Sequence, residues 1–240
     1  MTTKLREKPI LFSGPMIRAI LAGKTQTRRV VKPQPELNGT IHDRIPAWWW
    51  PTKASEAGYI HTDESSLRRI MEGDCPYQVG MNLWVREAWR AHVDGGTLLL
   101  NYRADDTVRE FQLADIAKPR DSLLRWTWKP PMHMPRFACR ISLRLTGVRV
   151  ERLQEISEAD AQAEGVEEID NPDYDSDDPC DDRPTSYIAA FAELWDEING
   201  KRAKGHYCWE SNPFCWVLAF ERVEADWPCI ANARTNPHRA

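Results

Sequence analysis

Gly23, Lys24 and Thr25 follow one another in the order that ends a phosphate-binding loop. Such a loop also needs a glycine five residues before the Gly-Lys pair, and its lysine opens a helix. Here Arg18 occupies the position of that glycine, and Gly23 follows a predicted helix. We therefore reject nucleoside triphosphate hydrolysis. GxSxG, HExxH and EF-hand motifs are also missing from the sequence.

The six cysteines are the obvious candidates for metal or disulfide chemistry, but none belongs to a CxxC pair. The tightest group of soft ligands is His206, Cys208 and Cys215. The same stretch is also typical of a loop that enters an aromatic strand. Because buried reduced cysteine is common in protein cores, we expect reduced thiols, no metal and no cofactor.

Three further features have either a functional or a structural interpretation. Glu87 stands on the apolar face of a predicted strand, where it is either a functional carboxylate or the buried partner of an arginine such as Arg29. His133 either lines a pocket or is a structural residue flanked by prolines. The three tryptophans at 48–50 are suited to stacking on bases or to packing over the core.

Apolar spacing and terminating residues predict three helices. Ser13 and Ser157 are typical helix caps, and a glycine stands at the end of each helix. The predicted helices span residues 13–23, 157–165 and 186–200.

Strands are predicted where apolar and polar residues alternate. The strongest covers 137–146, with one apolar and one basic face, and others cover 24–31, the residues after Gly80, and 214–223. Residues 91–122 are predicted to form a hairpin or loop around Asp94-Gly95-Gly96. The pattern favours an α+β fold, a small β-barrel with helices at its edges. We expect insertions at about 33–78, 91–125 and 168–185 and a disordered tail over 225–240.

Charge is strongly segregated along the chain. Residues 151–182 hold fourteen Asp or Glu and one Arg, a net charge of −13, so the total of −4 leaves +9 on the rest. Basic residues concentrate in 1–32 and 120–152, which predicts a basic surface patch. Such a patch either faces a nucleic acid or nucleotide or is a solvated face. The acidic stretch 170–183 is predicted to be a mobile loop.

No apolar stretch approaches the roughly 18 residues of a membrane span. The apolar stretch near the N-terminus is too short for a signal peptide. We therefore expect a cytoplasmic protein with no membrane partner.

Taken in order, the segments resemble the ASCH domain of the PUA-like superfamily. The resemblance covers residues 9–32, 76–90, 126–166 and 186–223 in pieces, and it implies one domain over 1–224, a PUA-like β-barrel, and RNA or a modified nucleoside as partner. The tryptophan-rich segments resemble prophage-encoded members. The matching features are the helix that ends in glycine, Lys24-x-x-Thr27-x-Arg29, Gly80-x-x-Leu83, a basic strand, LQEISEADAQAEGV, a closing aromatic strand, and the segments WVREAW, HMPR, LWDEINGKR and NPFCWV.

Some bacterial members of this family are amidohydrolases that remove the acetyl group of N(4)-acetylcytidine with a Lys, a Thr and a Glu. By resemblance, Lys24 is the base, Thr27 the nucleophile and Glu164 the third member. Glu164 ends the pattern L-x-x-[IL]-[ST]-x-x-x-A-x-x-E that begins at Leu153. The family usually has one residue between the glycine and the lysine, which this chain lacks after Gly23.

A lysine base must lose its proton near neutral pH. Lowering its pKa from about 10.4 to about 7 takes roughly 4.6 kcal/mol, which burial and the neighbouring Arg28 and Arg29 are suited to supply. An ionised Glu164 would oppose that change, so we assign Glu164 to orienting Lys24 or to binding the cytosine amine. Arg29 is placed to hold the negative charge that develops on the carbonyl oxygen.

We expect substrate-binding residues beyond this trio, and several functions remain open. One alternative is a non-catalytic RNA-binding module, another is a ribonuclease that uses Lys24, Arg29 and a carboxylate, and a third is a phage accessory protein that binds a host protein. In a purely structural interpretation, Lys24 and Thr27 only form a strand and Glu164 is one more acid on a solvated helix. The expected substrate-binding residues are Arg29, Glu87, Trp84, His133 and Arg136.

Overall fold

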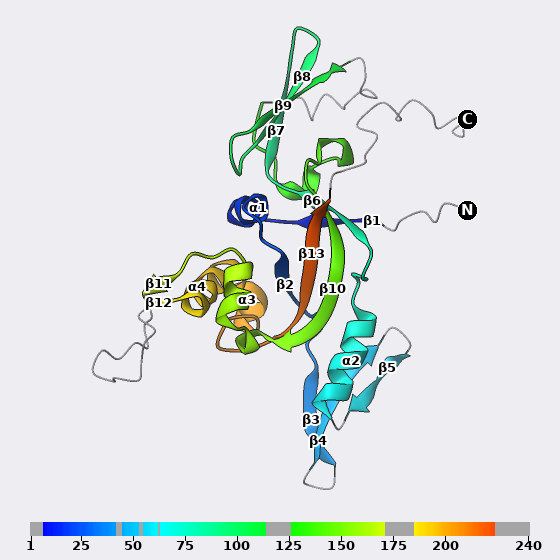
Figure 1. The fold of residues 1–240 in the computed structure, drawn as a ribbon. Coiled ribbons are helices and arrows are strands. Elements are labelled where there is room, and N and C mark those ends of the chain that lie inside the picture. Colours follow the sequence, from blue (N-terminus) through cyan, green and yellow to red (C-terminus); the bar gives the residue numbers. More distant parts are fainter. Residues whose placement is uncertain are drawn as a thin grey trace, which may run out of the picture. The chain divides into compact units, whose positions relative to one another are not determined.

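The computed structural model describes residues 7–41, 45–52, 55–61, 63–113, 126–170 and 185–223. These residues form a mixed α/β fold with four α-helices and several sheets (Figure 1). No sheet is seen to close on itself among the described residues, so the β-barrel that the sequence predicted stays a prediction. The chain divides into two compact units. Unit 1 comprises residues 1–23, 81–144 and 221–240, and unit 2 comprises residues 24–80 and 145–220.

Each unit combines strands and helices. Unit 1 contains β1 (Glu7–Leu11), α1 (Gly14–Leu21), β6 (Asn82–Arg86), β7 (Trp89–Asp94), β8 (Thr97–Tyr102), β9 (Val108–Gln112) and the 3-10 helices η3 (Pro131–His133) and η4 (Arg136–Ala138). Unit 2 contains β2 (Gln26–Val30), β3 (Glu36–Ile41), β4 (Ile45–Thr52), β5 (Ser55–His61), α2 (Glu64–Asp74), η5 (Leu153–Glu155), α3 (Glu158–Ala163), β11 (Ile169–Asp170), β12 (Thr185–Ser186), α4 (Tyr187–Asn199) and η6 (Arg202–Gly205). The long strands β10 (Ser142–Arg152) and β13 (Phe214–Val223) contribute residues to both units.

Unit 1 is organised around strand β6. This strand pairs in parallel with β1 and antiparallel with the first residues of β10. Helix α1 buries Ile17 and Ile20, which confirms the helix predicted over 13–23. Strands β7, β8 and β9 form a separate antiparallel sheet. Gly95 and Gly96, both with positive φ, make the β7–β8 turn, as the sequence predicted for this hairpin.

Unit 2 pairs β13 with β2 in antiparallel register, with Leu218 opposite Thr27. Both strands agree with the prediction. Residues 33–78, whose status as an insertion stays a prediction, contain the antiparallel sheet β3-β4-β5 and helix α2, which the sequence did not predict. Three successive tryptophans occupy both faces of β4, so alternating polarity does not mark this strand.

Helices α3 and α4 lie side by side in unit 2 (Figure 1) and confirm two further predictions. Ser157 Oγ accepts the backbone N–H of Asp160 at the start of α3, and Ser186 Oγ accepts that of Ala189 in α4. Such caps satisfy N–H groups that the first turn leaves without a partner. The two helices share a core with neighbouring strands and loops, formed by Leu153, Ile156, Ala161, Phe191, Trp195 and Cys215.

The strand predicted over 137–146 begins later than expected, at Ser142. Pro135 precedes the tight 3-10 turn η4, and the backbone N–H groups of Ala138 and Cys139 donate to Pro135 O and Arg136 O. Those N–H groups are therefore not available to a neighbouring strand, although the side chains alternate.

Two predicted segments lie outside the described residues: the acidic loop, apart from Asp170, and the tail over 225–240. Among the helices that the structure describes, none is long and apolar enough to cross a membrane.

Candidate functional site

Lys24 stands where the chain enters β2. The preceding residue, Gly23, has a φ of +108°, a conformation that favours glycine and turns the chain out of α1. Lys24 Nζ lies 3.0 Å from Glu164 Oε2, and the two side chains are 2% and 3% exposed. The structure therefore brings together two of the three predicted catalytic residues.

Glu164 occupies the C-terminal end of α3. Its backbone N–H donates to Asp160 O and Ala161 O, and Gly165 follows with a positive φ that ends the helix. A carboxylate near the last carbonyls of a helix is electrostatically unfavourable. Two cations offset this, because Arg28 Nη1 donates to Glu164 Oε1 at 3.1 Å while Lys24 holds the other oxygen. Glu164 is therefore not an acid on a solvated helix face.

The pair belongs to a larger ionic network inside unit 2. Arg28 Nη2 lies 3.0 Å from Glu151 Oε2 and 3.3 Å from Asp160 Oδ2. Arg149 pairs with the same two carboxylates. Charges in the network balance, since three cations meet three carboxylates. The members are Lys24, Arg28, Arg149, Glu151, Asp160 and Glu164.

The protonation of Lys24 is set by opposing effects. Burial lowers the pKa of Lys24, because an ammonium loses its hydration there. The Glu164 carboxylate raises this pKa, whereas Arg29 and Arg28 lower it further, and the net direction is downward. These directions, downward from burial and the two arginines and upward from Glu164, are the ones predicted from the sequence for the pKa of Lys24.

Thr27 is set apart from the Lys24–Glu164 pair. In a strand, alternate side chains point to opposite faces, and the side chains of Gln26 and Arg28 both reach Asp160. Thr27 therefore faces the other way. It is fully buried, and among the described residues its Oγ1 has no hydrogen-bond partner. No hydrogen bond in the described structure joins Thr27 to Lys24.

Arg29 follows on the same face as Thr27 and is half-buried. Burial lowers the pKa of its guanidinium, while Glu164 and Tyr77 raise it. Arg29 thus senses the charge of Glu164.

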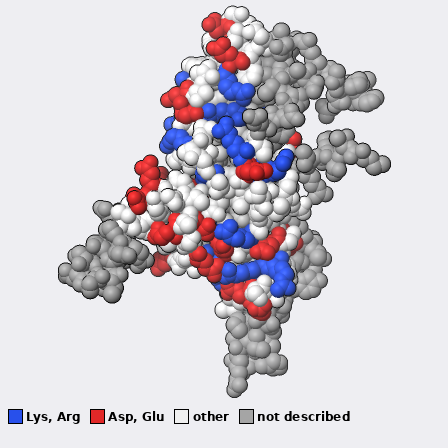
Figure 2. All heavy atoms as spheres, viewed as in Figure 1, with Lys and Arg blue, Asp and Glu red and all other residues white. Residues whose placement is uncertain are grey.

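Basic and acidic side chains are interspersed on the face of the molecule in Figure 2. The basic patch predicted from charge segregation is not seen as one continuous area on that face. Several of the basic residues of 120–152 have acidic partners, among them Arg140 and Arg149.

Glu87, which belongs to unit 1, is an ion-pair residue. Its oxygens accept from Arg140 Nε at 2.7 Å and Nη2 at 2.8 Å, and Arg140 also contacts Asp105. Arg140, and not Arg29, is therefore its partner. Strand β6 ends at Arg86, so Glu87 does not continue the same strand as Trp89. Burial raises the pKa of Glu87, and Arg140 opposes that effect.

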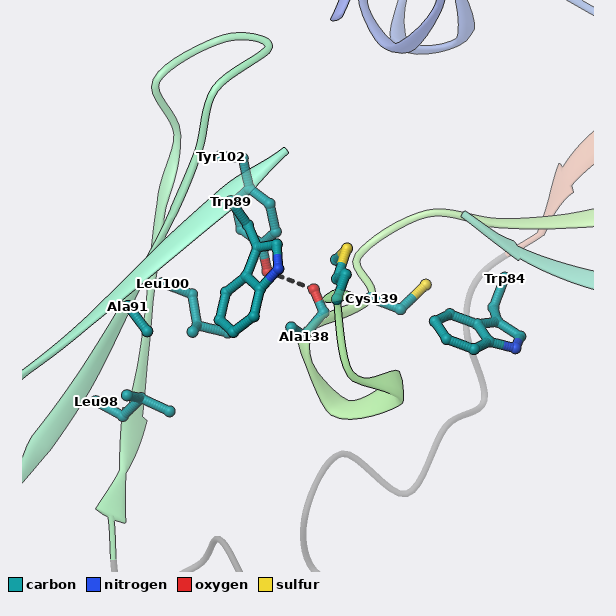
Figure 3. Close-up of a cluster of buried hydrophobic side chains, with 9 residues drawn as sticks. Trp84, Trp89, Ala91, Leu98, Leu100, Tyr102, Ala138 and Cys139 are labelled. Carbon is teal, nitrogen blue, oxygen red and sulfur yellow. Dashed lines mark hydrogen bonds between the residues drawn. The ribbon is translucent and has the colours of Figure 1, made fainter. Parts of the chain in front are cut away.

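The remaining predicted substrate-binding residues also belong to unit 1 and have structural contacts. Trp84 is 8% exposed and is part of a hydrophobic cluster, beside Cys139 in Figure 3. The Arg86 and Arg136 guanidinium carbons lie 4.4 and 5.4 Å from the Trp84 ring centroid, and Arg136 pairs with Glu7. His133 is exposed in η3.

The tryptophans at 48–50 and Cys215, the other candidates from the sequence, have structural environments. Trp50 is buried, and the Trp48 ring meets that of Phe214 edge-on, so these tryptophans pack. Cys215 is fully buried. Among the described residues, no three His, Cys, Asp or Glu side chains are grouped to hold a metal ion.

Of the two cations that contact Glu164, the sequence predicted Lys24 but not Arg28. The sequence also gave no indication that Glu151, Arg149 and Asp160 belong to the same network. The signal was available for Arg28, because residues 24, 26 and 28 share one face of a strand.

No protein-family model matches the chain, and neither a curated protein nor a solved structure matches it.

Proposed function

We propose that the chain is an ASCH-type protein with a PUA-like barrel that acts on a nucleoside or nucleic acid and hydrolyses an acylated base of the N(4)-acetylcytidine type. The observation that supports the proposal is the buried contact between Lys24 and Glu164. These residues are far apart in the sequence, and the resemblance to the family pairs them in one site.

The reaction requires a nucleophile, a base and a group that stabilises negative charge. Thr27 Oγ attacks the acetyl carbon while Lys24 Nζ takes the hydroxyl proton. The carbon–nitrogen bond then breaks, and the cytosine amine leaves with that proton. Water hydrolyses the resulting acetyl ester of Thr27, releases acetate and restores the hydroxyl. Arg29 stabilises the oxyanion.

Two features of the described residues agree with these roles. The pKa of Lys24 is lowered by burial, as a general base at neutral pH requires. The Thr27 hydroxyl has no hydrogen-bond partner among the described residues, so attack would break no existing bond. Glu164 is then a positioning residue, which holds the Lys24 amino group through the contact between Nζ and Oε2 until substrate binds.

Lys24 must also reach Thr27 in the complex with substrate. Catalytic hydrogen bonds are often missing or long in ligand-free enzymes and form when substrate binds. The second candidate, a non-catalytic RNA-binding module, is favoured by the missing contact between these two residues. In that case the ionic network around Arg28 serves only to hold α3 on β2.

The test is to incubate the protein with a panel of acylated nucleosides, N(4)-acetylcytidine first, and to measure release of acetate and of the deacylated nucleoside. Lys24→Arg keeps the charge but cannot act as a base near neutral pH, so the rate is lost. Thr27→Ser retains part of the rate. No hydrolysis of any of these substrates by the wild type would overturn the hydrolase proposal and leave the binding module, and equal measurable rates for the wild type and Lys24→Arg would remove Lys24 as the base.

A further inference from the structure

Unit 1 contains an exposed aromatic and cationic surface that the Lys24 site does not use. Trp126 is 45% exposed and Trp128 is 36% exposed. The carbon at the centre of the Arg90 guanidinium lies 4.0 Å from the Trp126 ring centroid and 4.4 Å from that of Trp128. One flat cation therefore contacts two half-exposed indole rings.

The β7–β8 hairpin explains why this surface faces outward. Trp89 and Ala91 are buried in the cluster of Figure 3, so Arg90 and His92, which alternate with them, lie on the opposite face of β7. Lys129 exchanges two backbone hydrogen bonds with Trp89, at 2.8 and 3.2 Å. Those bonds hold the segment with both exposed tryptophans alongside β7.

Further rings and cations extend the same surface. The His92 ring lies 5.6 Å from the Trp126 ring in an edge-on arrangement. The Arg103 guanidinium lies 5.9 Å from the Trp128 ring centroid. Contacts of this kind align planar groups that present π faces and positive charge to solvent.

Among the described residues, the positive charge of this surface is not paired with carboxylates. Arg90 Nε donates to Asn101 Oδ1, which is a neutral acceptor. Within the part of the chain that the structure describes, neither Arg90 nor Arg103 forms an ion pair with a carboxylate. Arg140 and Arg136 in the same unit do form such pairs. Arg90 and Arg103 thus remain available to an anionic partner.

We propose that Trp126, Trp128 and Arg90 form a stacking surface for single-stranded RNA, with Arg103 contacting its phosphates. Bases stack on indole rings and on guanidinium planes, and single strands present both unpaired bases and phosphates. A duplex hides its base faces. The positive charge of Arg90 and Arg103 therefore favours a nucleic acid, and the exposed indole rings favour a single strand.

The choice of RNA over DNA rests on the proposed function, which concerns a ribonucleoside. The proposal that bases stack on this surface does not rest on that function. The two proposals fail separately, because binding to this surface does not require Lys24.

The test measures binding of a fluorescent 12-nucleotide oligouridylate and of an abasic 12-mer with the same number of phosphates. Trp128→Ala should weaken oligouridylate binding about tenfold, in line with the loss of one stacked base. The abasic strand should lose less than twofold. Trp128→Phe should retain most of the binding, and Arg90→Lys should lose affinity although the charge remains. Arg144→Ala, which removes one exposed positive charge from the same unit, is the matched control and should change binding less than twofold.

If Trp128→Ala unfolds, Trp126→Ala is the second variant. It should weaken oligouridylate binding to the same extent. Unchanged oligouridylate binding in folded variants overturns the proposal. Equal losses for the oligouridylate and the abasic strand overturn stacking. Tighter binding of the deoxythymidine 12-mer than of the RNA overturns the choice of RNA. Binding of phosphatidylserine vesicles without RNA binding assigns the face to a membrane surface instead. If hydrolysis fails but RNA binding depends on the tryptophans, only the hydrolase proposal is overturned.

Discussion

Lys24 Nζ lies 3.0 Å from Glu164 Oε2 in a place where both side chains are almost fully buried. Each charge has lost most of its hydration, so each depends on the other for compensation. Arg28 makes this dependence asymmetric, because it provides Glu164 with a second cation, whereas Glu164 is the only carboxylate recorded in an ion pair with Lys24 among the described residues.

Glu164→Gln should therefore strongly destabilise the protein. The substitution leaves the charges of Lys24 and Arg28 buried with less compensation, and breaking one side of a buried pair costs about 3–5 kcal/mol. The free energy of unfolding in urea measures this loss. Glu193→Gln, at an exposed position of α4, is the matched control and should change stability by less than about 0.5 kcal/mol. A loss for Glu164→Gln no larger than that of the control would show that the pair contributes nothing.

The lowered pKa of Lys24 predicts a pH dependence with a definite sign. Between that pKa and the ordinary value of 10.5, the unfolded chain binds a proton that the folded protein has released. Stability therefore rises with pH over this window, by at most about 1.4 kcal/mol per pH unit. Other buried groups titrate at high pH, so the quantity to measure is the difference in unfolding free energy between wild type and Lys24→Met.

As pH increases from 6 to 10, the wild type should gain stability relative to Lys24→Met. A loss of stability relative to Lys24→Met would mean that Glu164 outweighs burial and raises the pKa of Lys24. Such a lysine stays protonated at neutral pH, so this result would also count against its role as a base.

The buried pair in unit 1 predicts unequal effects for the removal of Arg140 and for the removal of the Asp105 charge. Glu87 is 1% exposed, whereas the Asp105 side chain is 25% exposed. Arg140→Ala leaves Glu87 buried without its cation and should cost about 3–5 kcal/mol. Asp105→Asn removes a more hydrated acid and should cost about 1 kcal/mol or less. Thermal and urea unfolding of the two variants, side by side, measure the difference, and equal losses would refute it.

Sequence patterns predicted the elements whose residues carry local signals. Ser157 and Gly165 cap α3, and the ends of α1 and β13 likewise follow from residues inside those segments. The strands of 33–78 were missed because three tryptophans fill both faces of β4. Their polarity therefore has no period of two.

The candidate site was only partly accessible from the sequence. Pairing Lys24 with Glu164 required the family resemblance, because no local pattern links a strand entrance to a distant helix end. The partner of Glu87 depended on a long-range contact as well: an arginine was expected, but it is Arg140 and not the example that the sequence suggested, Arg29. The exposed tryptophans at 126 and 128 could not be distinguished from packed ones, since exposure depends on how the hairpin packs and not on residue type.

Thr27 gives the prediction that separates catalysis from structure. Its hydroxyl is buried and has no hydrogen-bond partner among the described residues, and burying such a group costs about 1–3 kcal/mol. Thr27→Val replaces the hydroxyl with a methyl group of similar size, so the variant should unfold at higher urea concentration than the wild type. It should also lose all hydrolysis of N(4)-acetylcytidine, because a methyl group cannot attack a carbonyl carbon.

Thr27→Ser keeps the nucleophile and should retain part of the rate, with lower stability from the lost methyl group. A gain in stability together with a loss of activity is expected of a hydroxyl kept for chemistry. A Thr27→Val protein that is less stable than the wild type would instead mean that the hydroxyl holds the fold together, and one that hydrolyses the substrate at the wild-type rate would remove Thr27 from the mechanism.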